Sequence, residues 1–414
     1  MPHMPSIHAA LFFPGKTARR FLYACFLCWL LPAASALAGG GTLLPASLVS
    51  NGGILVTRDR AILHSLNPDS LFVPASTWKI ATALEALTLL GPDHRFETRC
   101  LLGQDQTLYI QGSGDPMLVS EEITRMSRGL RDAGVSQVNG IVLDDTAFSL
   151  NSPADGASST PNPYDVMNSA LAVNFNTIHV AKEQSGAVRS AEPQTPTLPI
   201  MTELAASLPP GTHRINISQQ PERIWQYTGE LLQAQLRATG ITVSGTIRSG
   251  ATPVGIAPTY THRSSLPLTE LIAAMLRHSS NFMANQLFLA CGNRRFGLPA
   301  TWDKGKRALD DFLRTNVRLP GGSFTVEEGS GLSRKNRITP RAMLILLQAF
   351  TPHASLLANH DGVPLKSGTL TGVYAYAGYL PGPTGLDPFV LLLNQSNNSR
   401  DQVLTRLMTL HGGR

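Results

Sequence analysis

Short apolar runs bounded by turn residues predict β-strands near both ends of the chain. Residues 53–57 and 61–64 flank the charged segment 58–60 (Arg-Asp-Arg), and this arrangement predicts a β-hairpin. Residues 374–380 and 389–394 are mostly small, aromatic and aliphatic, which is typical of buried strands. Between these ends the pattern predicts further strands at residues 95–100, 107–110, 140–145, 171–181 and 241–248.

One helix is predicted over residues 74–90. Its apolar positions recur at helical spacing, as at Ile80, Leu84 and Leu87. A proline suits the start of a helix, where its missing N–H costs nothing, and Gly91 suits the position just past the end.

The same periodicity predicts several other helices, and polar stretches separate them. Residues 151–163 are rich in Ser, Pro, Gly and Asn and are predicted to form a loop, and residues 185–213 are similarly rich in Pro, Thr and Ser. The other predicted helices cover residues 120–135, 224–239, 267–276, 282–290, 340–350 and 399–411.

The first 38 residues have the pattern of a secretory signal peptide. A basic region with Lys16, Arg19 and Arg20 precedes the apolar run 21–31, and residues 36–38 (Ala-Leu-Ala) form a small-x-small cleavage site. A membrane anchor is the alternative, although the apolar run is short for a span. The pattern therefore predicts an exported, periplasmic protein.

Composition then narrows the classes of function. The chain has 414 residues, of which 43% are hydrophobic and 15% charged, so it can bury a sizeable core and is long enough for two domains. Removal of the signal peptide lowers the formal charge from +6 to +3. Since no block of Lys and Arg with interleaved aromatics is present, a nucleic-acid partner is not expected.

Two of the four cysteines lie in the predicted signal peptide and two in the mature chain. Cys25 and Cys28 lie within the apolar run of the signal peptide, where C-x-x-C is a coincidence and not a redox motif. Cys100 and Cys291 remain in the mature chain. In an oxidising compartment they could pair, and two buried free thiols are equally compatible with the sequence.

Ser76 and Lys79 are three residues apart and share one face of the first turn of the predicted helix 74–90. A serine hydroxyl is a weak nucleophile until a neighbouring base accepts its proton, and a lysine can be that base when burial lowers its pKa toward neutrality. A lone S-x-x-K pattern also occurs on ordinary helix surfaces. It therefore predicts catalysis only together with partners elsewhere in the chain.

Two later polar segments supply such partners. Residues 279–281 (Ser-Ser-Asn) lie between two predicted apolar helices, where a simple capped turn is the alternative interpretation. Residues 366–368 (Lys-Ser-Gly) precede the predicted strand 374–380. Three motifs thus follow one another along the chain, Ser76-x-x-Lys79, Ser279-x-Asn281 and Lys366-Ser367-Gly368. In this order they resemble the motifs of penicillin-binding proteins and serine β-lactamases.

The flanks of these motifs narrow the resemblance. Residues 329–334 (Gly-Ser-Gly-Leu-Ser-Arg), 366–374 and 377–379 look like the class C low-molecular-mass penicillin-binding proteins, which are D-alanyl-D-alanine carboxypeptidase/endopeptidases. The long interval between Ser76 and Ser279 fits the insertion that this class carries. The second motif is Ser-Ser-Asn where the family often has Ser-Asp-Asn, and the third is Lys-Ser-Gly where Lys-Thr-Gly is usual; both keep the functional atoms.

The resemblance implies an α+β fold with two parts. Residues 39–99 and 261–414 would form a serine β-lactamase/transpeptidase-like domain, in which helices and a helical cluster flank an antiparallel sheet. Residues 100–260 would form a mixed inserted domain. This insertion looks shorter than in the large members of the class, so the presence of both of its subdomains is open.

The resemblance also implies a function. The protein would cleave D-alanyl-D-alanine bonds of peptidoglycan stem peptides through an acyl-enzyme, as a carboxypeptidase, an endopeptidase or both, and would bind β-lactam antibiotics. It would need no cofactor and no metal, and neither H-E-x-x-H nor G-x-S-x-G occurs. The oligomeric state stays open. The implied catalytic residues are Ser76, Lys79, Ser279 and Asn281, and the implied substrate-binding residues are Lys366, Ser367, Gly368 and Thr369.

Two alternatives from other classes remain. A serine β-lactamase uses the same three motifs, but the long insertion argues against it. A non-catalytic cell-wall-binding protein would not need a nucleophile, a base and a relay serine together.

Asp145 is a further candidate for substrate binding. It ends the predicted apolar strand 140–145 and begins the pattern Asp-Thr-x-x-Phe, which resembles the place where class C members hold an acidic residue over the active site. A carboxylate there would pair with the free amine of a diamino acid in the stem peptide. The alternative is that Asp144 and Asp145 solvate the strand end or cap the next turn.

Overall fold

The computed structural model describes residues 47–412, and the predicted signal peptide lies outside this range. The described chain has an α+β fold, as expected. Among these residues no helix combines the length and apolar character needed to cross a membrane.

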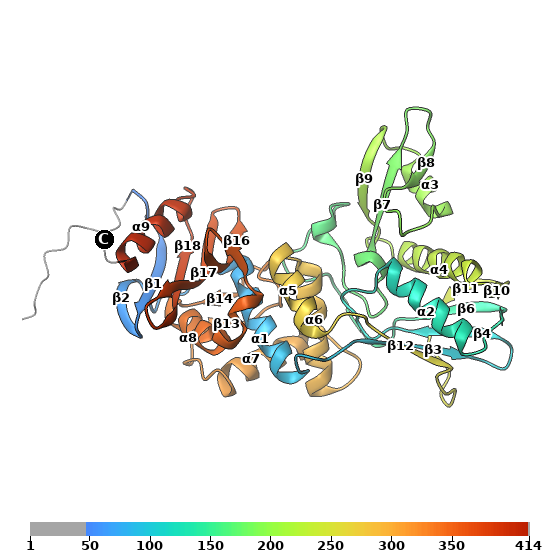
Figure 1. The fold of residues 1–414 in the computed structure, drawn as a ribbon, viewed down its shortest axis with the longest axis horizontal. Coiled ribbons are helices and arrows are strands. Elements are labelled where there is room, and N and C mark those ends of the chain that lie inside the picture. Colours follow the sequence, from blue (N-terminus) through green and yellow to red (C-terminus); the bar gives the residue numbers. More distant parts are fainter. Residues whose placement is uncertain (1–46, 413–414) are drawn as a thin grey trace, which may run out of the picture. The chain divides into compact units, whose positions relative to one another are not determined.

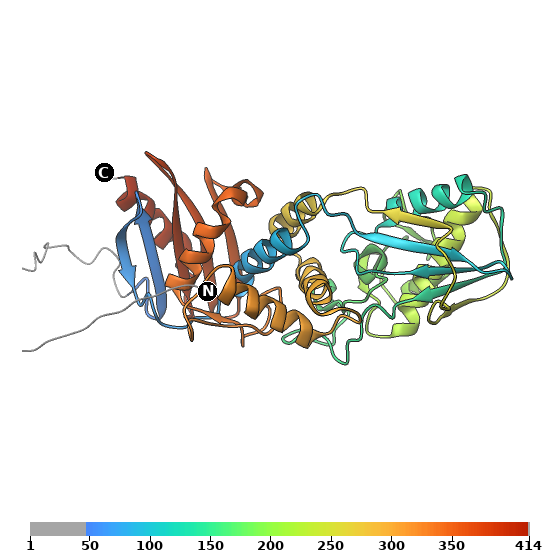
Figure 2. The ribbon, with the colours of Figure 1, turned by 90° about the horizontal axis from the view of Figure 1, so that it is seen from below.

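A six-stranded antiparallel sheet joins the two ends of the described chain. The predicted hairpin is confirmed, with Asp59 and Arg60 at positive φ in its turn, as a type I′ turn requires. Its first strand pairs with the last strand of the chain, so the blue and red strands lie side by side in Figures 1 and 2. In spatial order the strands are β15 (Ala358–His360), β16 (Val363–Leu370), β17 (Val373–Gly382), β18 (Gly385–Leu393), β1 (Gly52–Arg58) and β2 (Ala61–Leu66).

Both faces of this sheet are buried because successive side chains of a strand point to opposite faces. Val390 and Leu392 join the core that includes α8 (Pro340–Phe350). Leu391 and Leu393 join a separate core with α9 (Arg400–Gly412). This double burial explains why β18 is continuously apolar and not alternating.

A helical cluster packs beside the sheet. Its members are α1 (Lys79–Leu89), α5 (Leu268–His278), α6 (Asn281–Phe296) and α7 (Trp302–Thr315), and α1 contacts the other three (Figure 2). The sequence interpretation missed α7, which is mostly polar and buries only a narrow apolar face. The predicted end of α6 before Gly292 was wrong. A Cβ at Gly292 would lie 2.6 Å from the Gly305 nitrogen, so this glycine allows close helix packing and does not end the helix.

The predicted helix 74–90 is not a single α-helix. It begins as the 3₁₀ turn η1 (Ala75–Trp78), which Pro74 precedes as the capping residue, and continues as α1. Ala75 has a φ of 47°, a conformation that side-chain-bearing residues rarely adopt. Gly91 follows the helix at a φ of 93°, as predicted. The change from 3₁₀ to α geometry therefore falls between Ser76 and Lys79.

The segment between α1 and α5 has its own mixed sheet. Its inner strands β6 and β4 run parallel, and β3 and β12 add in antiparallel order. α2 (Ser120–Asp132) and α4 (Pro221–Ala238) contribute to a core separate from those above. The strands in spatial order are β11 (Ile247–Ser249), β6 (Gly140–Asp144), β4 (Thr107–Gln111), β3 (Glu97–Leu102) and β12 (Tyr260–Arg263).

A second, three-stranded sheet lies within the same segment. The predicted strand 171–181 was wrong in its first half, because Asn174, Phe175 and Asn176 have φ values of 48°, 59° and 50° and form a left-handed turn. The predicted strand 241–248 is likewise broken, into β10 (Thr242–Val243) and β11. The sheet and its helix comprise β8 (Val188–Ser190), β7 (Thr177–Lys182), β9 (Gly211–Asn216) and α3 (Pro199–Ala205).

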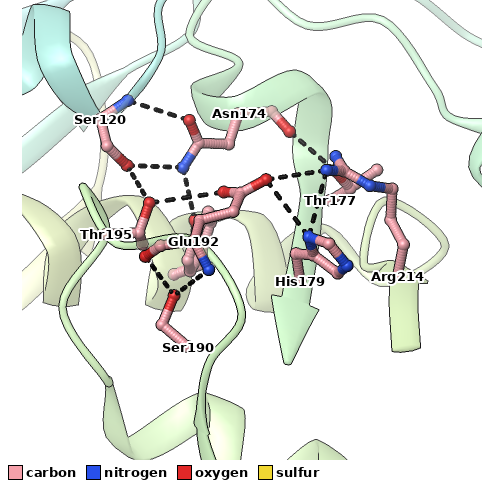
Figure 3. A network of polar contacts seen from close by, with 9 residues as sticks. Ser120, Asn174, Thr177, His179, Ser190, Glu192, Thr195 and Arg214 are labelled. Atoms are coloured by element: carbon pink, nitrogen blue, oxygen red, sulfur yellow. Dashed lines mark hydrogen bonds and ion pairs between the residues drawn. The ribbon is translucent and has the colours of Figure 1, made fainter. Parts of the chain in front are cut away.

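A polar network holds this small sheet against α2 and α4 (Figure 3). Asn174 accepts from the Ser120 N–H at 2.9 Å and donates to the Ser120 hydroxyl at 2.8 Å and the Tyr227 hydroxyl at 2.7 Å. Arg214 of β9 donates to Glu192 at 2.7 Å. The amide of Asn174 thus has all of its hydrogen-bonding groups engaged, which favours its left-handed backbone.

The remaining short elements are η2 (Pro163–Asp165), η3 (Val173–Asn176), β5 (Gln137–Val138), β13 (Phe324–Thr325), β14 (Arg337–Ile338) and η4 (Thr351–Leu356). Cys100 and Cys291 belong to different cores, and both are buried free thiols.

Candidate active site

Ser76 and Lys79 face each other at the junction of η1 and α1. The Lys79 Nζ donates to the Ser76 Oγ over 3.0 Å. The same nitrogen donates to the Asn281 Oδ1 at 2.7 Å and to the Ser330 carbonyl at 2.7 Å. Three separate parts of the chain therefore hold Lys79 within proton-transfer distance of a serine hydroxyl.

The surroundings of Lys79 favour its neutral form. Its side chain is fully buried, and this burial lowers its pKa to about 7, with the Lys366 cation adding to the decrease and the Glu328 carboxylate opposing it. A lysine with that pKa is substantially deprotonated at neutral pH and can accept a proton from serine. Ser76 is only partly buried, so a reactant can reach its hydroxyl.

The second motif contains both a turn and a contact to Lys79. Ser279 closes α5 with a left-handed backbone, φ 53°, and the Ser280 side chain caps α6 by accepting from the Met283 N–H. Asn281, the first residue of α6, thereby points its amide oxygen at Lys79. The Ser279 side chain makes no hydrogen bond to any residue in the range 47–412. The capped-turn interpretation is thus also correct, with Ser280 as the cap.

The third motif lies on β16, directly beside the turn that carries Ser76. A Cβ on Gly368 would lie 2.7 Å from the Pro74 carbonyl oxygen and 3.1 Å from the Ser76 nitrogen, so only glycine permits this approach. On the other side of the turn, Gly331 has a φ of 81°, and a Cβ there would lie 2.0 Å from the Ala75 carbonyl oxygen. The Ser76 backbone is therefore enclosed between two glycine-bearing segments.

Two cationic side chains lie at β16, Lys366 of the strand itself and Arg400 of α9. Lys366 is 3% exposed, its Nζ donates to the Ser367 carbonyl at 2.8 Å, and it forms no ion pair within the described part of the chain. Burial and then the Arg400 cation lower the pKa of Lys366 to about 8. The Arg400 Nη1 donates to the Thr369 Oγ1 at 2.6 Å and to the Gly368 carbonyl at 3.1 Å. This arrangement suits a ligand carboxylate.

Sequence reasoning missed Arg400 and the role of Ser330. Arg400 begins α9 after a polar loop, and no local pattern separates it from an ordinary surface arginine. Residues 329–334 were singled out by their resemblance to the family, but no contact with Lys79 was predicted. The contact is made by a backbone carbonyl, which is common to all residues and leaves no signal in the sequence.

Asp145 has a structural contact of its own. Its Oδ1 accepts from the Leu171 N–H at 2.8 Å, and burial raises the pKa of Asp145 to about 6, with backbone hydrogen bonds opposing the increase. No hydrogen bond or ion pair joins Asp145 to Ser76, Lys79 or Lys366 in the described structure. Asp144 accepts from Thr146 and from the Thr252 N–H.

The segment between α1 and α5 supports the start of α6. The Asn168 Nδ2 donates to the Phe282 carbonyl at 3.0 Å and to the Gln286 Oε1 at 3.0 Å. The rings of Phe175 and Phe282 meet edge to face with centroids 5.9 Å apart. Since α6 begins at Asn281, these contacts help to fix the amide that binds Lys79. Within residues 47–412, no group of three or more His, Cys, Asp or Glu side chains is placed to hold a metal ion.

Comparison with known proteins identifies the family of the chain. The D-Ala-D-Ala carboxypeptidase 3 (S13) family matches residues 45–365. A D-alanyl-D-alanine carboxypeptidase of Actinomadura sp. (strain R39) is 28% identical over 405 residues, covering 80% of this chain and 75% of the relative. The D-alanyl-D-alanine carboxypeptidase DacB of Haemophilus influenzae is 25% identical over 393 residues, covering 78% of this chain and 80% of the relative.

Solved structures share the fold. Penicillin binding protein 4 (dacB) from Haemophilus influenzae superposes with a TM-score of 0.72 at 22% identity, covering 89% of this chain and 98% of that chain. The predatory endopeptidase Bd0816 from Bdellovibrio bacteriovorus has a TM-score of 0.55 at 15% identity, covering 87% of this chain and 93% of that chain.

The fold and the three motifs define a class C low-molecular-mass penicillin-binding protein. The family match spans most of the chain, so the chain belongs to the D-Ala-D-Ala carboxypeptidase 3 (S13) family. It is a serine-type D-Ala-D-Ala carboxypeptidase.

Proposed function

We propose that Ser76 is the nucleophile and Lys79 the acylation base of a D,D-peptidase acting on peptidoglycan stem peptides. The observation that carries this assignment is the 3.0 Å hydrogen bond between the two side chains, made by a lysine whose pKa is lowered to about 7. The Ser76 Oγ attacks the carbonyl carbon of the D-alanyl-D-alanine bond, and its proton passes to the Lys79 Nζ. The negative charge that develops on the carbonyl oxygen is received by the backbone N–H groups of Ser76 and Thr369.

The leaving amine then needs a proton. Ser279 relays it from Lys79, and Asn281 orients Lys79 and the substrate amide. The C–N bond breaks, the terminal D-amino acid departs, and the remaining peptide stays as an ester on Ser76. Water hydrolyses this ester and regenerates the free hydroxyl. Carboxypeptidase and endopeptidase reactions share these steps and differ in what the departing amine is attached to.

Substrate recognition is assigned to β16. The carboxylate of the departing residue lies near Lys366, and the Ser367 and Thr369 hydroxyls donate to it. Support comes from the burial of Lys366 without an anionic partner and from the neighbouring Arg400 guanidinium. A β-lactam carries a carboxylate in a similar position, so the same groups serve penicillin binding; a dacB complex with a β-lactam is among the solved structures that share this fold.

We also propose the domain limits and the location. Residues 39–99 and 261–414 form the peptidase domain and residues 100–260 the inserted domain. The separate six-stranded and five-stranded sheets support a division into two parts. Strands β3 (Glu97–Leu102) and β12 (Tyr260–Arg263) of the five-stranded sheet extend beyond the proposed limits of the insertion. Location in the periplasm rests on the signal-peptide pattern of residues 1–38 and on the cell-wall substrate.

The test combines turnover with mapping of the adduct. The mature protein is incubated with a stem peptide ending in D-alanyl-D-alanine, and released D-alanine is measured. In parallel, a fluorescent penicillin is added, and the labelled peptide is identified by mass spectrometry. Release of D-alanine and a single adduct on Ser76, both abolished by Ser76→Ala, are expected. An adduct that persists in Ser76→Ala would refute the assignment.

A further inference from the structure

Glu328 is a buried carboxylate that the mechanism above does not use. Its side chain is 1% exposed. Oε1 accepts from the Gly331 N–H at 2.7 Å, the Ser333 N–H at 3.2 Å and the Asn336 Nδ2 at 2.7 Å. Oε2 accepts from the Ser330 N–H at 2.7 Å and the Ser330 Oγ at 2.5 Å. Five donors converge on one acidic group, and none of them belongs to a cation.

The carbonyl groups of residues 328–330 are bound from the other side, by the segment that carries the nucleophile. The Trp78 Nε1 donates to the Glu328 carbonyl at 2.9 Å, and the Thr82 Oγ1 donates to the next carbonyl at 2.6 Å. The third carbonyl accepts from the Lys79 Nζ at 2.7 Å. The loop thus lies between the Glu328 carboxylate, which binds its N–H groups, and the residues of η1 and α1, which bind its carbonyls.

We propose that Glu328 is a positioning residue for Lys79: its carboxylate fixes the loop that presents the Ser330 carbonyl to the lysine, and its charge offsets that of Lys366. This inference rests on the proposed role of Lys79 as the acylation base. Neither the sequence motifs nor the family match assigns a role to Glu328.

Because Glu328 is buried, its carboxylate can both fix the position of the loop and act on the charge of Lys79. Buried N–H groups without an acceptor are costly, so removal of Glu328 would drive the loop to rearrange and the Ser330 carbonyl would move with it. The charged groups that act on Lys79 are Lys366 from β16, which disfavours the protonated lysine, and Glu328, which favours it. In a buried site such opposing charges are weakly screened by solvent.

The deciding measurement is the pH dependence of acylation by a chromogenic β-lactam, in the full mature protein. In the wild type, the rate falls as pH drops and Lys79 becomes protonated. Glu328→Gln removes the negative charge, so the acid limb is expected to move to lower pH by about one unit. Displacement of the loop is expected to lower the plateau rate by roughly 10²-fold.

Glu327→Gln is the matched control. Glu327 is the adjacent residue and undergoes the same loss of charge, but it pairs at the surface with Lys306 at 2.8 Å. Its acid limb and its plateau are expected to match those of the wild type. A merely structural role for Glu328 would lower the plateau without moving the limb, and that result overturns the electrostatic part of the inference. An unchanged plateau in Glu328→Gln overturns the positioning part.

Glu328→Asp keeps the inference testable if Glu328→Gln fails to fold. Aspartate retains the charge but is too short to reach all five donors. In Glu328→Asp, the acid limb of the pH profile is expected to stay at the wild-type pH, while the plateau rate of acylation falls. A plateau rate equal to that of the wild type would contradict the inference. An acid limb that moves by as much as one pH unit would contradict it as well. Lys79→Ala separates this outcome from failure of the proposed function, because normal acylation in Lys79→Ala would refute the base assignment itself.

Discussion

Gly368 of β16 and Ser76 of η1 are in backbone contact, and a Cβ on Gly368 would lie 3.1 Å from the Ser76 nitrogen. The same Cβ would lie 2.7 Å from the Pro74 carbonyl oxygen. Backbone atoms on both sides cannot rotate away as a flexible side chain can. The glycine therefore sets the distance between β16 and the turn that carries the nucleophile.

Gly368→Ala should separate these two segments. Because the proposed oxyanion site uses the N–H groups of Ser76 and Thr369, we expect acylation by penicillin to slow by about 10²- to 10³-fold. Stopped-flow fluorescence with a fluorescent penicillin gives the rate. Gly321→Ala is the control, since a Cβ at Gly321 meets no atom within 4 Å. Wild-type acylation in Gly368→Ala would show that the close contact is not needed.

Lys79 and Lys366 should respond differently to substitution. Lys79→Ala removes the proposed base and should lower acylation by several orders of magnitude at every pH. In the wild type, acylation should rise with pH through about 7, because only the deprotonated Lys79 can accept the proton. Lys366→Ala should chiefly raise the KM for carboxylate-bearing substrates. Acylation within a few-fold of wild type in both variants would contradict the site assignment.

Asp145→Asn tests whether this carboxylate recognises a substrate amine. Asparagine retains an oxygen that can accept from the Leu171 N–H, so the structural contact should survive. A partly desolvated contact between charges is worth about 1.5–3 kcal/mol, or roughly 10- to 150-fold in rate. We expect kcat/KM for a stem peptide with a free side-chain amine to fall by that factor, and acylation by benzylpenicillin to change little. Equal effects on both, or no effect, would leave Asp145 with its structural role.

Glu85 should make stability depend on pH. Glu85 belongs to α1, and its side chain is fully buried. This burial raises the pKa of Glu85 well above its usual value. As pH rises above about 4.3, the unfolded chain loses this proton while the folded protein keeps it, so the free energy of unfolding falls. The slope for one proton is at most about 1.4 kcal/mol per pH unit.

Glu85→Gln removes this titration, so the variant should gain stability relative to the wild type between pH 5 and 8. Urea unfolding at a series of pH values measures the difference. Glu121→Gln, at an exposed position of α2, provides the control. A difference between Glu85→Gln and wild type that stays constant with pH would show that Glu85 is ionised in the folded state.

The periodicity of apolar residues and the order of the motifs allowed many helices and strands and the candidate catalytic residues to be predicted from the sequence. Alternation and helical spacing depend on near neighbours, so the β1–β2 hairpin, α2, α4, α8 and the strands β17 and β18 could be predicted. Strands β15 and β16 of the same sheet were not predicted. The three motifs could be recognised because side-chain chemistry is constrained at fixed short spacings. That they serve one site was inferred from resemblance, and in the structure hydrogen bonds join Lys79 directly to Ser76 and Asn281.

Contacts between distant segments decided the local conformations and the site groups that the sequence did not predict. The helix at Ser76 begins as a 3₁₀ turn where Gly331 and Gly368 pack against it, and Gly292 continues α6 because α7 needs close approach. Asn174 to Asn176 turn left-handed where side chains from α2 and α4 bind the Asn174 amide. Glu328 lies in a loop with no periodic pattern, and Arg400 is the first residue of α9, where nothing local distinguishes it from a surface arginine. The hydrogen bond from Lys79 to the Ser330 carbonyl spans 251 residues and leaves no mark on either local sequence. Only the tertiary structure could bring such distant groups to Lys79 and Lys366.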